Sequence, residues 1–261
     1  MVRFFAYLPK GANVAILAKT VTENPKLPGT IYTAAKAIEE AGGKALAIVC
    51  DCRDAAQVEA AVKKTVETFG GIDILINNVS ALYSTPVADT DVKRYDLAMS
   101  LNPRATFVAS KFCIPHLRKS SNPHILTISP PLYAVTDPRN WYAKMGTGYV
   151  TAKCSMSLIT FGLSGELKDD GIAANTLWPR TAIQTAAVKN LLGGSESMEK
   201  SRKEDIMADS AYIILTSDSR RTTGNSFIDD HVLASVGKQD LSSYKPDVKV
   251  PEHELLTDFM V

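Results

Sequence analysis

The sequence predicts an α/β domain built on a doubly wound parallel sheet of the Rossmann type. Short apolar runs alternate along the chain with amphipathic stretches of helical length, and this alternation is typical of βαβ units. The 261 residues are the size of one such domain, and 45% apolar with 22% charged residues is ordinary for a folded protein. The 29 basic and 28 acidic residues almost cancel, so the composition favours neither nucleic acid nor an anionic membrane as a partner.

Several classes of protein are excluded by what the chain lacks. No apolar run approaches the roughly 20 residues that cross a bilayer, so we expect no membrane span. The cysteines lack the spacing of a zinc or thioredoxin-type pair and the four histidines are scattered, which predicts free thiols in a reducing compartment and no bound metal. Neither end carries a visible targeting signal.

The first two predicted strands enclose one predicted helix. Residues 13–18 form an apolar run that favours a buried strand, and residues 44–50 repeat the pattern. Residues 30–40 between them have helical character, and Gly42 and Gly43 close that segment.

The next helix has a start and a stop signal. Asp54 and Gln57 have capping-box form, and apolar side chains recur behind them at three and four residues. Gly70 is the expected end of this helix. Residues 72–76 then form a mostly apolar strand, which we expect to be buried on both faces.

The same alternation continues to about residue 234. Further helices are expected at 90–117, 148–167 and 203–215, and further strands at 124–128, 173–177 and 226–228. These strands bring the expected total to six. The polar residues 235–261 are expected to form an extended tail, which leaves residues 1–234 as the domain.

Two tyrosine–lysine pairs stand four residues apart, namely Tyr149 with Lys153 and Tyr32 with Lys36. This spacing puts both side chains on one helix face. A phenol, with a pKa of about 10, is a poor acid at neutral pH, and a neighbouring ammonium stabilises the phenolate. Such a pair therefore suits proton transfer to or from a substrate oxygen, but the spacing alone does not choose between the two.

The sequence around each pair favours Tyr149 and Lys153 as the functional pair. Paired asparagines follow a strand, an asparagine lies in a helix, a serine ends a strand, and the tyrosine–lysine pair is on the next helix. In this sequence these residues are Asn77, Asn78, Asn102, Ser129, Tyr149 and Lys153. This order resembles that of the short-chain dehydrogenase/reductase family, whose ligands bind at the carboxyl ends of parallel strands. Tyr32 lies upstream of the whole set, and we interpret it as a surface or packing residue.

Three further stretches, at residues 28–35, 128–131 and 178–187, narrow the resemblance to one group within the family. The longer members of that group carry an additional C-terminal sterol-carrier domain. We expect no such domain here, because the chain lacks the length for it.

The resemblance implies roles for three catalytic residues. Tyr149 would be the acid/base, and Lys153 would lower the pKa of its phenol and hold the ribose of the cofactor. Asn102 would help hold a proton-relay water, although Pro103 after it is unusual inside a helix and is expected to distort the turn. The alternatives are that Tyr149 only packs, that Lys153 is a solvated helix lysine, and that Asn102 kinks or caps the helix.

Ser129 matches the family least well. The family usually has two small polar residues at this strand end, and the second carries the catalytic hydroxyl. Here the second position is Pro130. Either Ser129 supplies the hydroxyl after a local shift, or the hydroxyl is absent.

A dinucleotide cofactor is implied as well, and Lys19 makes NADP the expected one. Lys19 ends the first predicted strand, where a cation suits a 2′-phosphate and an acidic residue would suit the ribose of NAD. By resemblance, Asp51 is the adenine-side carboxylate, Asn78 lines the cofactor site, and residues 179–185 cover the nicotinamide. The alternatives are that Lys19 is a surface lysine, Asp51 a loop aspartate and Asn78 a structural amide.

The family's glycine-rich phosphate loop does not occur among the 15 glycines. Its backbone N–H groups normally cradle the pyrophosphate, and the chain begins about where the family's first helix should end. Residues 1–8 cannot replace the first strand, because a parallel crossover needs a dozen or more residues, so we interpret them as a remnant helix or arm. The strands at 13–18 and 44–50 would then close against the strand at 72–76 or leave edges unpaired.

Two functions follow from these observations. The first is an NADP-dependent oxidoreductase acting on a hydroxyl or carbonyl of a lipid-like substrate. By resemblance it would be a homo-oligomer inside the cell, in peroxisomes or mitochondria. The second is a catalytically inactive, truncated α/β protein that does not bind the dinucleotide. The motif order and Lys19 favour the first function, whereas the missing glycines and Pro130 favour the second.

Overall fold

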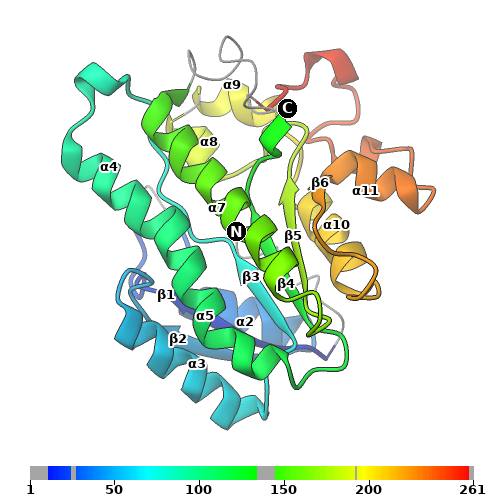
Figure 1. The fold of residues 1–261 in the computed structure, drawn as a ribbon. Coiled ribbons are helices and arrows are strands. Elements are labelled where there is room, and N and C mark those ends of the chain that lie inside the picture. The colour runs from blue at the N-terminus through cyan, green and yellow to red at the C-terminus, as the bar shows by residue number, and fades with distance from the viewer. Residues whose placement is uncertain (1–10, 25–27, 134–144, 192, 259–261) are drawn as a thin grey trace. The chain divides into compact units, whose positions relative to one another are not determined.

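The computed structural model describes residues 11–24, 28–133, 145–191 and 193–258 (Figure 1). Residues 1–8, with their expected remnant helix or arm, lie outside these ranges. The described residues fall into two compact units. In both units parallel strands are connected through helices, which confirms the α/β fold class.

The larger unit, made mainly of residues 52–178 and 215–227, contains a four-stranded sheet in the order β3-β4-β5-β6. The strands are β3 (Ile74–Asn77), β4 (His124–Ile128), β5 (Ala173–Trp178) and β6 (Ser226–Ile228). In the parallel ladders, His124 lies opposite Ile74 on one side and opposite Ala173 on the other. Because β4 and β5 each have a neighbour on both sides, they are the most buried strands.

β3 differs from the prediction in two ways. It begins at Ile74, two residues later than expected, and its apolar residues are half-buried. It lies at the edge of the four-stranded sheet and so has one strand neighbour there. The expectation of a strand buried on both faces was therefore wrong.

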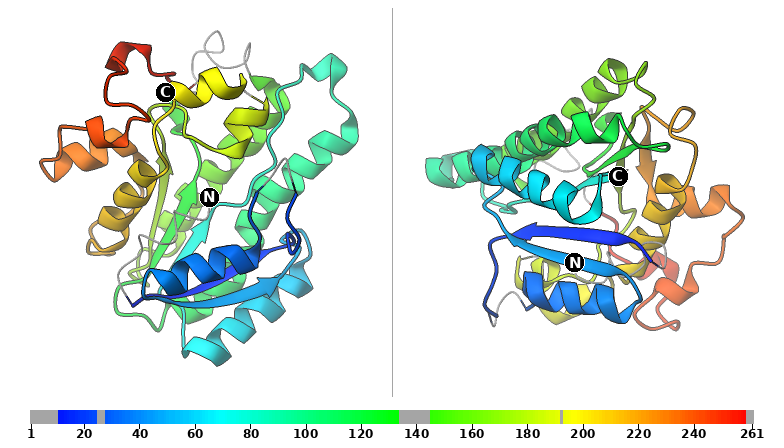
Figure 2. Two further views of the ribbon diagram at one scale, coloured as in Figure 1. Left: turned by 180° about the vertical axis from the view of Figure 1, so that it is seen from behind. Right: turned by 90° about the horizontal axis from the view of Figure 1, so that it is seen from below.

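Among the described residues of the larger unit there are four α-helices. They are α3 (Ala55–Phe69), α4 (Val92–Met99), α5 (Ala105–Leu117) and α7 (Thr147–Glu166). Asp54 caps α3 as predicted, since its Oδ1 accepts the N–H of Ala56 at 2.9 Å, and Gly70 ends the helix at a φ of 88°. α5 and α7 contact the sheet strands and lie along the same face (Figures 1 and 2).

The helix expected over residues 90–117 is interrupted by a π-helical turn, Ser100–Arg104, between α4 and α5. Pro103 lies in this turn. Proline has no N–H to donate and its ring displaces the carbonyl one turn back, so a wider turn relieves the clash. Pro103 therefore distorts the helix, as predicted, and Asn102 beside it is fully buried.

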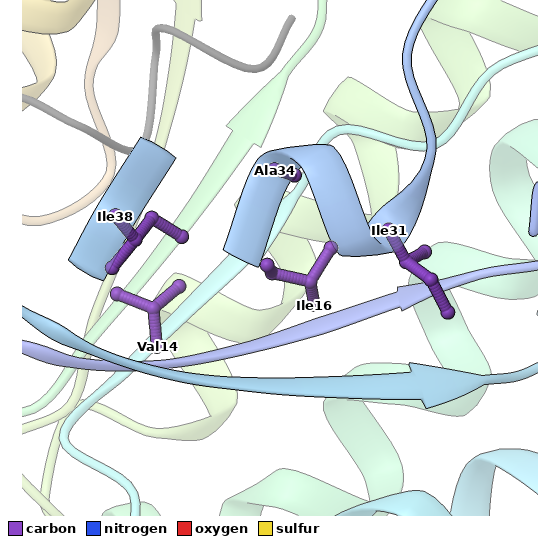
Figure 3. Packing of buried hydrophobic residues seen from close by; sticks show 5 residues of the cluster. All are labelled: Val14, Ile16, Ile31, Ala34 and Ile38. Atoms are coloured by element: carbon purple, nitrogen blue, oxygen red, sulfur yellow. The ribbon is translucent and has the colours of Figure 1, made fainter. Parts of the chain in front are cut away.

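The second unit begins with β1 (Asn13–Ala18), α2 (Ile31–Glu40) and β2 (Lys44–Val49). β1 and β2 are parallel, with Asn13 opposite Lys44. Spacings of three and four residues put the buried side chains of α2 on one face, and Figure 3 shows them directed onto β1. The cluster consists of Val14, Ile16, Ile31, Ala34 and Ile38.

β1 and β2 form a sheet of their own. Among the residues that the structure describes, no ladder joins β1 to β3. The alternative in which the first two strands close against the third within one sheet is therefore not found.

The remaining helices come from the C-terminal part of the chain. They are α8 (Ala186–Leu191), α9 (Gly194–Glu199), α10 (Asp205–Leu215) and α11 (Asp229–Ser235). Among the described helices none is long and apolar enough to cross a membrane. All four cysteines are free thiols, and two of them are buried.

The segment after α11 is not an extended tail. It contains two short 3-10 turns, Ser242–Tyr244 and Glu252–Glu254, and the side chains of Tyr244 and Leu255 are buried. Isolated apolar anchors thus fold back a segment whose composition is polar. The domain boundary at residue 234 stays a prediction.

Candidate active site

Tyr149 and Lys153 lie one turn apart on α7, and both are buried. Only 5% of Tyr149 and 3% of Lys153 is exposed, whereas Tyr32 of the competing pair is 55% exposed on α2. Burial therefore separates the two pairs in the way that the order of motifs predicted.

The ammonium of Lys153 lies at the carboxyl ends of two central strands. Its Nζ donates a hydrogen bond of 2.5 Å to the carbonyl of Ile128, the last residue of β4. It also lies 5.1 Å from the ring centroid of Trp178, the last residue of β5. A carbonyl and an aromatic face both stabilise a buried cation, so the charge of Lys153 is held where ligands bind in parallel sheets.

Ser129 is fully buried, and its hydroxyl is directed toward the later part of α7. Ser157 donates to Ser129 Oγ at 2.9 Å and also lies 2.6 Å from the carbonyl of Pro130. Ser157 is eight residues, or about 12 Å of helix, beyond Tyr149. The structure thus gives the hydroxyl of Ser129 a contact with α7, and a catalytic role for it stays a prediction.

Asn102 holds the loop that follows β3. Its Oδ1 accepts the N–H of Ala81 at 2.8 Å, and its Nδ2 lies 3.4 Å from the carbonyl of the same residue. Its own carbonyl accepts the hydroxyl of Thr106 at 2.8 Å. The structure thus gives Asn102 a clamping contact, and a role with a relay water stays a prediction.

The paired asparagines divide into a buried and a half-buried residue. Nδ2 of Asn77 lies 3.4 Å from both Ser110 Oγ on α5 and Thr127 Oγ1 on β4. This amide ties β3 to a neighbouring helix and a neighbouring strand. Asn78 is half-buried, and its predicted place beside a cofactor stays a prediction.

Tyr83 was not predicted as a site residue. It is 7% exposed, and its ring meets that of Tyr149 edge to face, with centroids 6.4 Å apart and an angle of 72°. Burial, followed by the nearby Tyr95, raises the pKa of Tyr83, which keeps its phenol protonated. No periodicity marks an aromatic residue in a loop, so the sequence carried no signal for it.

Lys19 and Asp51 form an ion pair in the second unit, with Nζ and Oδ2 3.3 Å apart. β1 and β2 are parallel, with Ala18 opposite Val49, so the residues just beyond their carboxyl ends lie side by side. Lys19 is 55% and Asp51 is 19% exposed, and such a pair contributes only about 0–1 kcal/mol. A phosphate could therefore compete for Lys19 at little cost.

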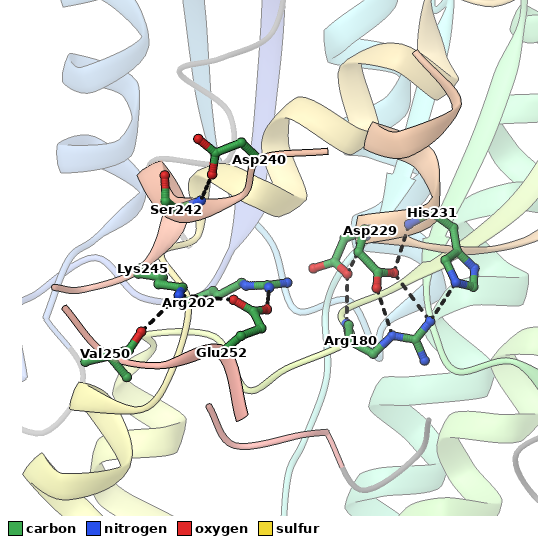
Figure 4. Close-up of polar contacts among 10 residues, drawn as sticks. Arg180, Arg202, Asp229, His231, Asp240, Ser242, Lys245, Val250 and Glu252 are labelled. Atoms are coloured by element: carbon green, nitrogen blue, oxygen red, sulfur yellow. Dashed lines mark hydrogen bonds and ion pairs between the residues drawn. The ribbon is translucent and has the colours of Figure 1, made fainter. Parts of the chain in front are cut away.

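The segment 179–185 is anchored by carboxylates of α11 (Figure 4). Oδ1 of Asp229 accepts the backbone N–H groups of Arg180 and Asp230, each at 2.8 Å. The guanidinium of Arg180 lies 3.0 Å from Asp230 Oδ2 and 2.9 Å from His231 Nε2. Burial raises the pKa of Asp229 to about 6, and the two backbone hydrogen bonds oppose that rise.

The C-terminal segment holds the same loop from another side. Arg202 is 2% exposed and is bonded to Glu252, which also pairs with Lys245 at 3.3 Å (Figure 4). Thr257 forms an antiparallel bridge with Thr181. The predicted nicotinamide loop is therefore fixed by hydrogen bonds within its own unit.

Each unit, taken by itself, offers groups that suit part of a dinucleotide. In the second unit Lys19 and Asp51 suit an adenosine carrying a phosphate, and in the larger unit Lys153 suits a ribose. At the start of α2, however, the N–H groups of Tyr32 and Thr33 are taken by Thr30 Oγ1, at 3.2 and 3.1 Å. At this helix, the first one described, no set of free N–H groups is left to cradle a pyrophosphate.

Comparison with known proteins supports the family resemblance that the order of motifs indicated. The family model for short chain dehydrogenases matches residues 6–194. Hydroxysteroid dehydrogenase-like protein 2 from Xenopus laevis is 50% identical over 251 residues, and the human protein of that name is 48% identical over 251 residues. Each alignment covers 96% of this chain, and the chain spans 58% of the length of these relatives. They form the group that the three stretches at 28–35, 128–131 and 178–187 resemble.

Two crystal structures are also similar over the whole chain. A candidate dehydrogenase from Xanthomonas campestris is 46% identical with a TM-score of 0.92, covering 100% of this chain and 93% of that one. A short chain dehydrogenase from Mycobacterium thermoresistibile is 50% identical with a TM-score of 0.88, covering 100% and 89%. Because the family model matches most of the chain, this protein belongs to the short-chain dehydrogenase/reductase family.

Proposed function

We propose that this chain is an NADP-dependent oxidoreductase acting on a hydroxyl or carbonyl group of a lipid-like substrate. The family is one of oxidoreductases that bind a nicotinamide dinucleotide. The single observation that carries the proposal is the buried pair of Tyr149 and Lys153, with the ammonium held at the carboxyl ends of β4 and β5.

In the proposed reaction Tyr149 handles the proton. It donates its phenolic proton to the carbonyl oxygen during reduction, and the phenolate accepts the proton of the hydroxyl during oxidation. Lys153 stabilises the phenolate by its charge, and its fixed position keeps that charge one helical turn away. The nicotinamide, when bound, supplies or accepts the hydride at the substrate carbon.

The preference for NADP rests on Lys19. Its side chain is half exposed and lies 3.3 Å from Asp51 Oδ2, which leaves its ammonium accessible to a 2′-phosphate. A blue fluorescent protein from a metagenomic library, 24% identical with a TM-score of 0.68, was solved with NADPH and shares the fold. The lipid-like substrate, the homo-oligomer and a peroxisomal or mitochondrial location inside the cell are inferred from the resemblance to the hydroxysteroid dehydrogenase-like group.

The proposal is tested by Tyr149→Phe, with Tyr32→Phe as the matched control. Turnover of a panel of steroid and aliphatic alcohols would be followed by NADPH absorbance. Removing an acid/base group typically costs a factor of about 10²–10⁴ in rate, and we expect a loss of that size for Tyr149→Phe alone. Full activity of Tyr149→Phe would refute the role of the phenol.

A second candidate function is a catalytically inactive α/β protein. It is favoured by the absence of a glycine-rich loop from these 261 residues and by the start of α2, where Thr30 Oγ1 accepts the N–H groups of Tyr32 and Thr33. Titration of the purified 261-residue chain with NADPH, followed by cofactor fluorescence, separates the two functions. Without a pyrophosphate cradle we expect binding to be weak. Saturable binding, weak or tight, supports the first function and contradicts the second, and no detectable binding supports the second.

Intact-mass measurement on the native protein provides an independent check. About 30 additional residues that include a glycine-rich loop would supply the phosphate cradle and restore the first function in full.

A further inference from the structure

The loop between β3 and α4 is fastened at two points. At its start the side chain of Asn102 holds both backbone groups of Ala81. Farther along, the hydroxyl of Thr90 lies 2.7 Å from that of Thr85 and 3.1 Å from the carbonyl of Thr85. The loop between these two points is therefore confined, and Tyr83 lies in the middle of it.

Tyr83 occupies the space beside the start of α7. Its ring contacts Tyr149 edge to face, and its hydroxyl is buried without a hydrogen-bond partner in the described structure. A buried hydroxyl normally has a partner, so hydrogen bonding does not explain this position. Contact of the ring with Tyr149 is the interaction that the structure offers instead.

Two glycines of the same region make room for the loop. A Cβ on Gly148 would lie 2.0 Å from the hydroxyl of Tyr83 and 3.2 Å from its Cζ. A Cβ on Gly146, whose φ is 74°, would lie 2.3 Å from the carbonyl oxygen of Thr85. The start of α7 and the loop thus fit together only because these positions have no side chain.

We propose that Tyr83 is a positioning residue, which sets the ring of Tyr149 by edge-to-face packing, and that Gly148 is a glycine because Tyr83 fills the space of its side chain. This inference rests on the proposed role of Tyr149. It goes beyond that role because it assigns the orientation of the phenol to a residue from a different element.

The test uses the complete 261-residue chain labelled with ¹³C at tyrosine Cζ, and it needs neither cofactor nor substrate. The signal of Tyr149 is identified by its loss in Tyr149→Phe and is followed through a pH titration. Gly148→Ala should displace Tyr83, and so change both the chemical shift of Tyr149 and the midpoint of its titration. Adding Tyr83→Phe removes the colliding oxygen and leaves contacts of 3.2 Å with the ring carbons of Tyr83 and Tyr95, so it should move both values most of the way back to those of the parent.

Three controls complete the design. Tyr83→Phe alone keeps the ring and should leave the Tyr149 signal unchanged. Tyr83→Leu removes the ring and should displace the signal as Gly148→Ala does. Gly162→Ala, on the same helix with no atom within 4 Å of the added Cβ, should have no effect.

The inference is overturned if Gly148→Ala and Tyr83→Leu both leave the Tyr149 signal in place. It is also overturned if Tyr83→Phe does not move the signal back toward its parent position in the Gly148→Ala background, because the added methyl would then act without Tyr83. If Tyr83→Leu does not fold, the Gly148→Ala and double-variant pair still decides. Turnover is measured separately, with a loss of about 10²-fold expected for a misplaced group. A displaced signal with no turnover in any form would leave the positioning intact and reject the proposed function.

Discussion

Asp229→Asn should remove one component of the pH dependence of stability. The carboxyl of Asp229 is fully buried, and its pKa rises from 3.8 to about 6. The folded protein therefore retains a proton that the unfolded chain releases at lower pH. The sign follows directly, because a raised carboxyl pKa stabilises the fold at acid pH and this stabilisation is lost as the pH rises through about 6.

The size of the effect follows from the same pKa. The whole rise corresponds to about 3 kcal/mol at about 1.4 kcal/mol per pKa unit. Between about pH 4.5 and about pH 7 the part that is lost is about 2 kcal/mol. The amide introduced by Asp229→Asn does not titrate, and its oxygen can still accept the N–H groups of Arg180 and Asp230. The variant should therefore gain about 2 kcal/mol relative to the parent over that interval.

Urea denaturation followed by circular dichroism at a series of pH values measures this difference. Asp229→Ala is the matched control, because it removes the acceptor as well as the charge and should be destabilised at every pH. A stability difference between Asp229→Asn and the parent that stays constant from about pH 4.5 to about pH 7 would refute the reasoning.

Three further predictions concern substitutions at single residues. Gly162→Ala should raise the free energy of unfolding by about 0.5–1 kcal/mol, because the added methyl meets nothing and a helical glycine is costly; a lower urea midpoint would contradict this. Asn102→Ala should cost at least about 1–3 kcal/mol, because the N–H of Ala81 loses its partner, and an unchanged melting temperature would rule out the clamp. Lys19→Ser should weaken NADPH binding roughly tenfold, or about 1.4 kcal/mol, with NADH binding unaffected in fluorescence titrations of any form that binds; equal losses for both cofactors would remove Lys19 from the 2′-phosphate.

The strands were predictable because a strand buried in a parallel sheet is a short run of apolar residues, which is visible in the local sequence. β1 and β4 have the predicted bounds, since each is a compact apolar run between polar or glycine-containing segments. The pair of Tyr149 and Lys153 was predictable for a related reason. Its spacing is fixed by the helix, and the order of the surrounding motifs separated it from the pair at Tyr32.

Contacts between distant elements were not predictable in this way. Tyr83 and Trp178 reach the site from a loop and a strand end, at separations that no helical or strand period relates to Tyr149 or Lys153. Pro103 correctly predicted that the helix is distorted. It did not predict a π-helical turn, because the type of turn depends on which other backbone groups form hydrogen bonds around the proline. The prediction of an extended C-terminal tail was wrong because the average composition is polar and does not reveal the two buried anchors, Tyr244 and Leu255.

The β1–α2–β2 part of the second unit has a consequence for the cooperativity of unfolding. Its two strands pair only with each other among the described residues, and its buried cluster has five members. A two-stranded sheet is marginal by itself, whereas β4 lies between two partners. Amide protons of β1 and β2 should therefore exchange with solvent through a sub-global opening, while those of β4 wait for complete unfolding. The ion pair of Lys19 and Asp51 lies at the ends of β1 and β2 and would separate in the same opening. A ligand bound to this pair would therefore slow the hydrogen exchange of the β1 amides.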